Sequence, residues 1–308
     1  MGPGSWSRDF PQGPDRAVRA TVFLTAGSLI AAAMSFPPRL LAAPCSHSNA
    51  AALGSPAAQR SPLNAAVFGS GRDAACAASP EADSARWGRF LPEIAHQQKR
   101  IWLFPRSLAR GRHWLPFTAF VLGTGSLIVL DQYDAPYFRR TTRFHTFNTT
   151  LTGVNAVAGM AAVPGALYAI AHFRHDGYMQ RTVELAGEAV LDSEALNLVL
   201  RDVSRRLPPR DIPLNGNFAD SFFDRHVGPF YVGPGGFPSG HTIGAVSLAT
   251  IFARRYRRHR WVPWLAYGLA GVVGFSRLTR SDHFPSDVFA GAFLGYAISR
   301  YAVLRGTR

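Results

Sequence analysis

The sequence predicts an all-α fold, a bundle of about six helices with its functional residues at helix ends. The apolar runs of the 308-residue chain are long, and few stretches alternate between apolar and polar residues. Long runs of this kind are typical of helices, whereas alternation is typical of half-buried strands. Only 17% of the residues are charged, against roughly one quarter in soluble domains. This low charge content favours a membrane-associated bundle.

The first part of the chain divides into three regions by composition. Within residues 1–43, Arg16 and Arg19 lie close before the short apolar run Ala20–Phe36, and small residues follow it. This pattern predicts a secretory signal peptide, with an uncleaved N-terminal anchor as the alternative. Residues 44–84 are rich in Ala, Ser, Pro and Gly and are predicted to form a disordered linker. Residues 85–112 mix aromatic and basic side chains, as an interfacial helix on a membrane or on the bundle does.

Residues 113–308 are predicted to form the helical bundle domain. One of its segments carries Glu184, Glu188 and Asp192 at intervals of four, so these carboxylates share one helix face. Such a face cannot contact lipid and must point to the bundle interior or to water. In chain order the predicted helices are Trp114–Leu130, Leu151–Phe173, Thr182–Val203, Thr242–Tyr256, Trp261–Phe275 and Val288–Leu304.

The formal net charge is +14, and every basic residue except Lys99 is an arginine. This balance suits anionic partners such as phospholipid head groups or phosphorylated substrates. It does not favour nucleic acid, because the charge is scattered over loops and does not follow one face of a helix. The chain has no spacing typical of metal ligands, so we expect neither a metal nor another cofactor.

The first motif with a chemical meaning is Phe237-Pro238-Ser239-Gly240-His241, directly before a predicted helix. Pro, Ser and Gly favour a turn that leads into a helix N-terminus. The free backbone N–H groups and the helix dipole at such a terminus attract an anion. A histidine in the first helical turn would point at that anion.

The second motif consists of Ser276-Arg277 followed by His283 and Asp287. Arg277 offers the forked donors that bind phosphate oxygens. His283 and Asp287 are four residues apart, so their side chains meet in a helical turn. A carboxylate on one imidazole nitrogen fixes the tautomer and leaves the other nitrogen free to attack. Alone, such a pair is often only a surface contact, but with the anion-binding turn it indicates a catalytic site.

These two motifs resemble those of the type 2 phosphatidic acid phosphatase and haloperoxidase superfamily over residues 113–308. Pro238-Ser239-Gly240-His241 matches its P-S-G-H motif, and residues 276–287 match S-R-x-x-x-x-x-H-x-x-x-D with its spacing. The third motif, K-x-x-x-x-x-x-R-P, is degraded. Arg201 stands at its lysine, and Pro208 stands where the phosphate-binding arginine belongs.

The resemblance implies a role for each matching residue and a fold like the acid phosphatase and haloperoxidase core. His283, oriented by Asp287, would attack phosphorus, and His241 would protonate the leaving alcohol. Arg206 or Arg210 would replace the arginine missing at Pro208. The other phosphate-binding residues would be Arg201, Ser239, Gly240 and Arg277.

We therefore expect a phosphatase that hydrolyses phosphate monoesters or pyrophosphates through a phospho-histidine. Its substrates are expected to be lipids, either phosphatidic acid or an isoprenoid pyrophosphate. Two alternatives stay open, a non-catalytic phosphate- or lipid-binding membrane protein and a vanadate-dependent haloperoxidase. The expected location is a bacterial inner membrane with the site facing the periplasm. A periplasmic bundle is the alternative, because the mean hydropathy is close to zero. The sequence does not indicate an oligomeric state.

Overall fold

The computed structural model describes residues 86–213, 216–218, 220–224 and 235–305. All regular secondary structure within these ranges is helical, which confirms the predicted all-α class. The predicted signal peptide or anchor (1–43) and the predicted linker (44–84) lie outside the described residues.

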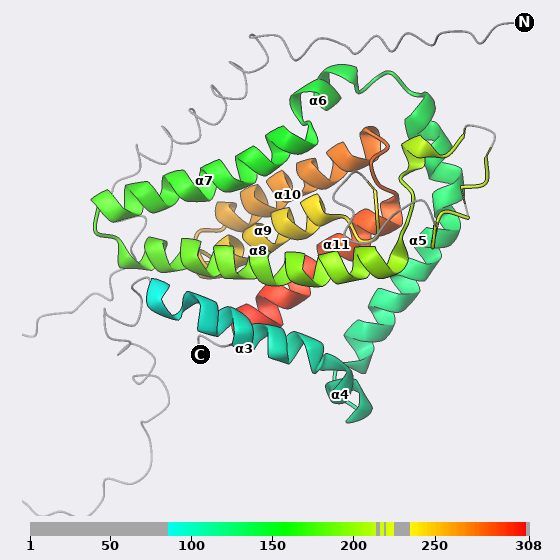
Figure 1. Ribbon diagram of the computed structural model, residues 1–308. Coiled ribbons are helices and arrows are strands. Elements are labelled where there is room, and N and C mark those ends of the chain that lie inside the picture. Colours follow the sequence, from blue (N-terminus) through cyan, green and yellow to red (C-terminus); the bar gives the residue numbers. More distant parts are fainter. Residues whose placement is uncertain (1–85, 214–215, 219, 225–234, 306–308) are drawn as a thin grey trace, which may run out of the picture.

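Six long helices form the bundle and correspond to the six predicted segments (Figure 1). They are α5 (Trp114–Arg140), α7 (Gly153–Phe173), α8 (Gly177–Ser204), α9 (Gly240–Arg255), α10 (Trp261–Thr279) and α11 (Pro285–Ile298). Shorter elements precede, connect or extend them: η3 (Trp87–Arg89), α3 (Phe90–Trp102), α4 (Phe104–Ala109), α6 (His145–Thr150), η4 (Pro209–Asp211) and a π-helical turn, η5 (Ser299–Val303).

The helix α5 is longer than the sequence predicted. The predicted segment stopped before Asp131, because a charged residue after an apolar run is typical of a helix end. In the structure α5 continues to Arg140, and Asp131 is fully buried within it. The buried charge is tolerated because the guanidinium of Arg206 lies 2.6 Å from the Asp131 carboxylate.

The helix α9 lies at the centre of the bundle, packed against α8, α10 and α11. Two glycines let α11 approach it closely. A Cβ atom at Gly295 would lie 2.6 Å from the carbonyl oxygen of Ile243, and one at Gly291 would lie 2.7 Å from that of Ser239. Any side chain at these positions would push the helices apart. The close contact fixes the start of α9 beside the start of α11.

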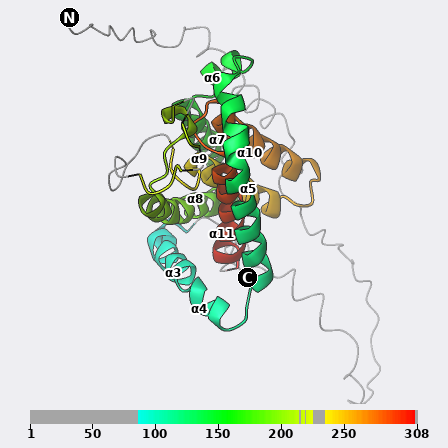
Figure 2. The ribbon, with the colours of Figure 1, turned by 90° about the vertical axis from the view of Figure 1, so that its right-hand side faces the viewer.

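The acidic face of α8 lies under α3, which runs along the bundle surface (Figure 2). Nε2 of Gln97 donates to Glu188 at 2.7 Å, and Nε2 of Gln98 donates to Asp192 at 2.9 Å. The three carboxylates of this face are completely buried. The prediction that this face avoids lipid is confirmed, and its partner is the helix that precedes the bundle.

In the described part of the chain, α5 and α7 are the helices long and apolar enough to cross a membrane. In each helix, only 11% of the apolar 18-residue stretch is buried inside the structure. Leu115 of α5 and Val154 of α7 are 85% and 79% exposed. Core helices of soluble proteins bury their apolar side chains, so these two helices need an apolar surrounding outside the bundle.

We expect the substitution Asp192→Asn to stabilise the protein at high pH. Burial, reinforced by the Glu188 carboxylate, raises the pKa of Asp192 to about 7, whereas an unfolded aspartate titrates near about 3.9. The folded state therefore binds the proton more tightly, and stability falls as the pH rises through this interval. Asn carries no such charge, so the variant should gain roughly 2 kcal/mol above about pH 8 and nothing near pH 4.

Thermal unfolding of the detergent-purified protein at both pH values measures this gain. Asp134→Asn, at an exposed position of α5, serves as the control and should change stability equally little at both. An Asp192→Asn gain of the same size at both pH values would contradict the titration.

Candidate active site

The helix ends that carry the predicted site residues meet at one end of the bundle (Figure 1). Successive long helices run in opposite directions from α7 to α8 and from α9 through α11. The starts of α7, α9 and α11 therefore lie near the ends of α8 and α10. One full motif leads into α9, and the other runs from the end of α10 to the start of α11. The antiparallel order of the helices therefore brings both motifs to the same end of the bundle.

His283 and Asp287 form the pair that the spacing predicted. Nδ1 of His283 lies 3.4 Å from Oδ2 of Asp287. Asp287 is in the first turn of α11, where the same Oδ2 accepts the backbone N–H of Phe284 at 2.9 Å. Burial opposes ionisation of this carboxyl, but the charges of Arg206 and His283 outweigh burial and lower its pKa. An ionised Asp287 holds the proton on Nδ1 and leaves Nε2 free.

His241 occupies the first turn of α9, as predicted. Its Nε2 lies 3.2 Å from the carbonyl oxygen of Gly153. Burial and the positive charge of Arg277 lower the pKa of His241 to about 4, so the imidazole is neutral at pH 7. An anion bound beside it would favour the protonated form. A bound phosphate would thus help to keep His241 protonated, as its expected role of proton donor requires.

One short segment, residues 148–153, holds three site residues through its backbone carbonyls. The Asn148 carbonyl accepts Nη1 of Arg280 at 2.7 Å. The Leu151 carbonyl accepts Nη2 of Arg277 at 2.6 Å, and the Gly153 carbonyl faces His241. Sequence reasoning missed this segment, because a backbone acceptor needs no particular side chain.

Arg201 lies against Gly236, directly before the segment that carries the P-S-G-H motif. It is in the last turn of α8, and a Cβ atom at Gly236 would lie 2.7 Å from its Nε. Gly236 also has a φ of +85°, a conformation that glycine adopts without strain. Pro208 lies against the neighbouring Gly235, whose Cβ would be 2.6 Å from the Pro208 Cδ atom. A proline ring thus fills the place where the motif has an arginine.

The turn before α9 is held by the start of α11. The backbone N–H of Ser239 donates to the Asp287 carbonyl at 3.0 Å, and Oγ of Ser239 accepts from Thr242 at 3.0 Å. Gly240 begins α9 close to the Asn197 side chain, which a Cβ atom would meet at 2.7 Å. Both predicted residues of the turn therefore lie at the helix N-terminus beside His241.

The structure places the two candidate replacement arginines in different surroundings. Arg206 is buried behind Asp287 and donates to its Oδ1 at 2.6 Å. Arg210 is partly exposed, and its Nη1 lies 2.5 Å from Oδ1 of Asp282. Asp282 also contacts Arg280 at 3.1 Å and Arg277 at 3.5 Å. Arg210, Arg277 and Arg280 thus form an arginine cluster around Asp282, next to His283 in the chain.

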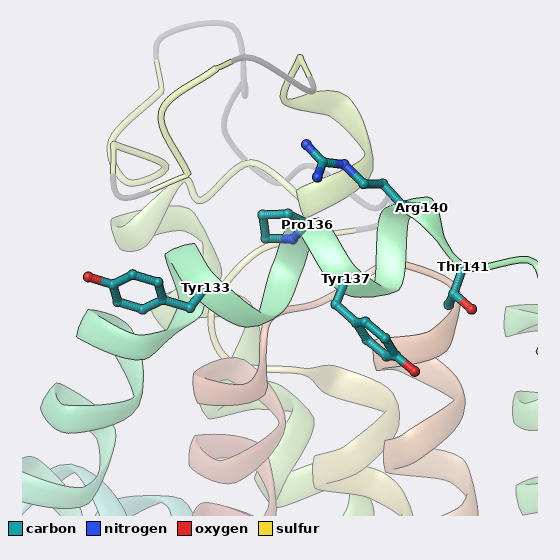
Figure 3. A pocket seen from close by; sticks show the side chains of 5 residues that line it. All are labelled: Tyr133, Pro136, Tyr137, Arg140 and Thr141. Carbon is teal, nitrogen blue, oxygen red and sulfur yellow. The ribbon is translucent and has the colours of Figure 1, made fainter.

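Two clefts open beside the arginine cluster. One, of about 330 Å³, is lined by Phe138, Arg139, Thr141, Asn148, Arg210, Thr279, Arg280 and Ser281. The other, of about 480 Å³, lies along the last turns of α5, where Figure 3 shows its lining residues Tyr133, Pro136, Tyr137, Arg140 and Thr141. Thr141 belongs to both, so a polar cleft at the site adjoins an aromatic one on the outside of α5.

Within the described residues, no three His, Cys, Asp or Glu side chains are grouped so that they could hold a metal ion. The site contains two histidines, a buried carboxylate and several arginines, and the start of a helix. This set suits the binding of a phosphoryl group and nucleophilic attack on it.

Residues 185–306 match the model of the PAP2 superfamily. This part of the chain is therefore similar to the PAP2 superfamily. The match runs from within α8 to the end of the chain and includes all three motifs.

Curated proteins are similar to short parts of this chain. A lipid A 1-phosphatase of Porphyromonas gingivalis is 38% identical over 63 residues, which are 20% of this chain and 14% of that protein. A lipid A 4'-phosphatase of the same organism is 32% identical over 66 residues, 21% of this chain and 28% of that protein. The bacitracin transport permease protein BcrC of Bacillus licheniformis is 42% identical over 59 residues, 19% of this chain and 28% of that protein. The chain thus spans less than a third of the length of each.

A solved structure is also similar to this chain. It is a transmembrane PAP2-type phosphatidylglycerolphosphate phosphatase of Bacillus subtilis, with 21% sequence identity and a TM-score of 0.38. The similarity covers 66% of this chain and 92% of that one.

We expect Gly236→Ala to weaken phosphate binding by displacing Arg201. The added Cβ would meet Nε of Arg201 at 2.7 Å at a positive φ, so both the turn and the arginine must shift. Inhibition by inorganic phosphate should weaken by about tenfold, and stability should fall by about 1 kcal/mol. Gly159→Ala is the matched control, since it also lies in the bundle and has open space around its Cβ position. Equal phosphate inhibition in both variants would contradict the role of Gly236.

Proposed function

We propose that this chain is a phosphatase that hydrolyses phosphate monoesters or pyrophosphates of membrane lipids through a phospho-histidine. The observation that carries the proposal is the pairing of His283 with the buried Asp287, beside the arginine cluster and within reach of the same backbone segment as His241. This is the arrangement of an oriented nucleophile, an anion-binding site and a proton donor.

The reaction has two steps with balanced proton transfers. Nε2 of His283 forms a bond to phosphorus as the bond from phosphorus to the leaving oxygen breaks. His241 gives its proton to that oxygen and becomes neutral. It then takes a proton from water, whose oxygen attacks phosphorus and breaks the bond to His283. Inorganic phosphate leaves, and both histidines return to their starting states.

The arginines supply the charge that the phosphoryl group needs. Arg277 is buried and held by the Leu151 carbonyl, so its fork is fixed before substrate binds. Arg210 is the better candidate for the arginine missing at Pro208, because it belongs to the arginine cluster and is partly exposed. Arg206 lies behind Asp287, with its donors bound to buried oxygens.

A lipid substrate is supported by the apolar outside of the bundle. α5 begins with Trp114 and ends with Tyr133, Tyr137 and two arginines, the residues that favour the two interfaces of a membrane. α10 begins with the exposed Trp261 and Trp264 at the end away from the site. Two of the curated relatives act, by their names, on lipid A.

We further propose an orientation with the site on the periplasmic side of a bacterial inner membrane. The connection between α9 and α10, at the far end from the site, carries five arginines between residues 254 and 260. Short loops with this many basic residues stay in the cytoplasm. The exposed apolar faces of α5 and α7 favour this location over a bundle free in the periplasm.

A non-catalytic binding protein is the second candidate, favoured by Pro208 in place of the motif arginine. Such a protein would bind phosphate or a lipid phosphate without a His283-dependent reaction. Turnover therefore separates the two.

We expect His283→Ala to reduce phosphate release by about a thousandfold or more, because no other group can form the covalent intermediate. Purified protein in detergent is given phosphatidic acid, an isoprenoid diphosphate or an aryl phosphate, without added metal. Labelled substrate quenched at alkaline pH should leave a phosphoryl group on the wild-type chain and none on the variant. Binding of phosphate without release by either protein would instead support the second candidate.

We expect Arg210→Gln to lower kcat/KM by about ten- to a hundredfold, since one charged donor to the phosphoryl group is lost. The matched control is Arg143→Gln, an exposed arginine in the loop that follows α5, which should leave kcat/KM unchanged. If Arg210→Gln also leaves it unchanged, the replacement arginine is not Arg210.

A further inference from the structure

Behind the nucleophile lies a charged network that no substrate can touch. It joins Asp131 of α5, Arg206 of the segment after α8, and Ser286 and Asp287 of α11. Each of these side chains is at most 2% exposed. Three separate parts of the chain thus meet around one guanidinium group.

The guanidinium of Arg206 has oxygen partners on its edge and aromatic rings on its faces. Nη1 donates to Asp287 and Ser286 at 2.6 Å each, and Nη2 donates to Asp131 at 2.6 Å. Its Cζ atom lies 3.9 Å from the Phe284 ring centroid and 4.3 Å from that of Phe222. Nε donates to a serine hydroxyl at 3.0 Å. With its edge and faces engaged, this side chain is held where it is.

The network places an ionised carboxylate beside the imidazole of His283. Two carboxylates, Asp131 and Asp287, contact the single guanidinium of Arg206. Burial opposes ionisation of Asp287, but the Arg206 charge helps to lower its pKa. The imidazole of His283 acquires positive charge when its Nε2 bonds to phosphorus while Nδ1 keeps its proton. Asp287 stands 3.4 Å from that Nδ1. The network therefore stabilises the charge that develops during attack.

We propose that Arg206 and Asp131 are positioning residues of the nucleophile, which hold Asp287 so that its Oδ2 faces Nδ1 of His283. The inference rests on the proposed phospho-histidine reaction. Arg206 fixes Oδ1, and the Phe284 N–H fixes Oδ2 from one side. With both oxygens held, the carboxylate cannot rotate away. Asp131 in turn holds Arg206 and the backbone N–H of Ser286.

The charged groups around His283 come from several elements. Asp287 of α11 faces Nδ1, and Asp282 precedes His283 in the chain. The backbone carbonyl of Arg277 in α10 accepts the backbone N–H of His283 at 3.3 Å. His241 of α9 is close enough to interact electrostatically with His283. Asp287 contacts both Arg206 and His283, so Arg206 acts on His283 through this carboxylate.

The test compares Arg206→Gln, Arg206→Lys and Asp131→Asn with wild type in detergent, over a range of pH. We expect Arg206→Gln to lower kcat about a hundredfold with KM within about twofold. Arg206→Lys, which keeps the charge, should restore part of kcat. Asp131→Asn should lower kcat less, again at constant KM.

Arg181→Gln is the matched structural control. Arg181 also lies between two buried carboxylates, Glu184 at 2.7 Å and Glu188 at 3.1 Å, but at the other end of α8. It should lower the thermal stability like Arg206→Gln while kcat and the pH–rate profile of the folded protein stay unchanged. A higher KM at unchanged kcat in Arg206→Gln would overturn the proposal and make Arg206 a phosphate ligand. Equal behaviour of the two glutamine variants would also overturn it.

A readout without turnover separates this inference from the proposed function. ¹⁵N-histidine NMR spectra of the wild type should contain a His283 signal with the proton on Nδ1, assigned by its loss in His283→Ala. Arg206→Gln should shift or broaden that signal, and Arg181→Gln should not. An unchanged signal in Arg206→Gln overturns the positioning role. Absent phosphate release with the expected NMR change would reject only the phosphatase.

Discussion

The structure of the site depends on one constraint, that two buried carboxylates must share one guanidinium. Asp131 and Asp287 come from helices far apart in the chain, and Arg206 lies between them at 2.6 Å from each. Removing Arg206 would leave both carboxylates uncompensated in the interior, at a cost of about 3–5 kcal/mol. This requirement draws α5 onto the start of α11 and places the segment after α8 behind the site. The same contact that completes the fold also sets the carboxylate beside His283.

Much of the fold followed from local patterns in the sequence. Long apolar runs predicted the six helices, and the four-residue spacing of Glu184, Glu188 and Asp192 predicted a face turned away from lipid. The predicted end of α5 was wrong, because the partner that neutralises Asp131 is 75 residues away in the sequence. For the same reason, the sequence did not indicate that α3 covers the acidic face. Local periodicity determines helices, whereas the burial of a charge is decided by distant parts of the chain.

The candidate site was predictable where residue type and spacing carry the chemistry. His283 with Asp287 and the turn before His241 are of this kind, and the structure brings them to one end of the bundle. Spacing could not separate Arg206 from Arg210, since both lie two residues from Pro208. Their surroundings differ because Arg206 meets aromatic rings and buried oxygens, whereas Arg210 meets Asp282 at a partly open cleft.

Residues 148–153 hold Arg280, Arg277 and His241 with main-chain oxygens. These acceptors belong to the backbone, so they depend on the path of the chain and not on the identity of the side chains that carry them. The stretch lies before residue 185, where the family match begins. Residue matching follows side-chain identity, so a wall of the site that is made of peptide groups escapes it. Two related proteins can therefore share the backbone shape of this wall without recognisable sequence similarity in the segment that forms it.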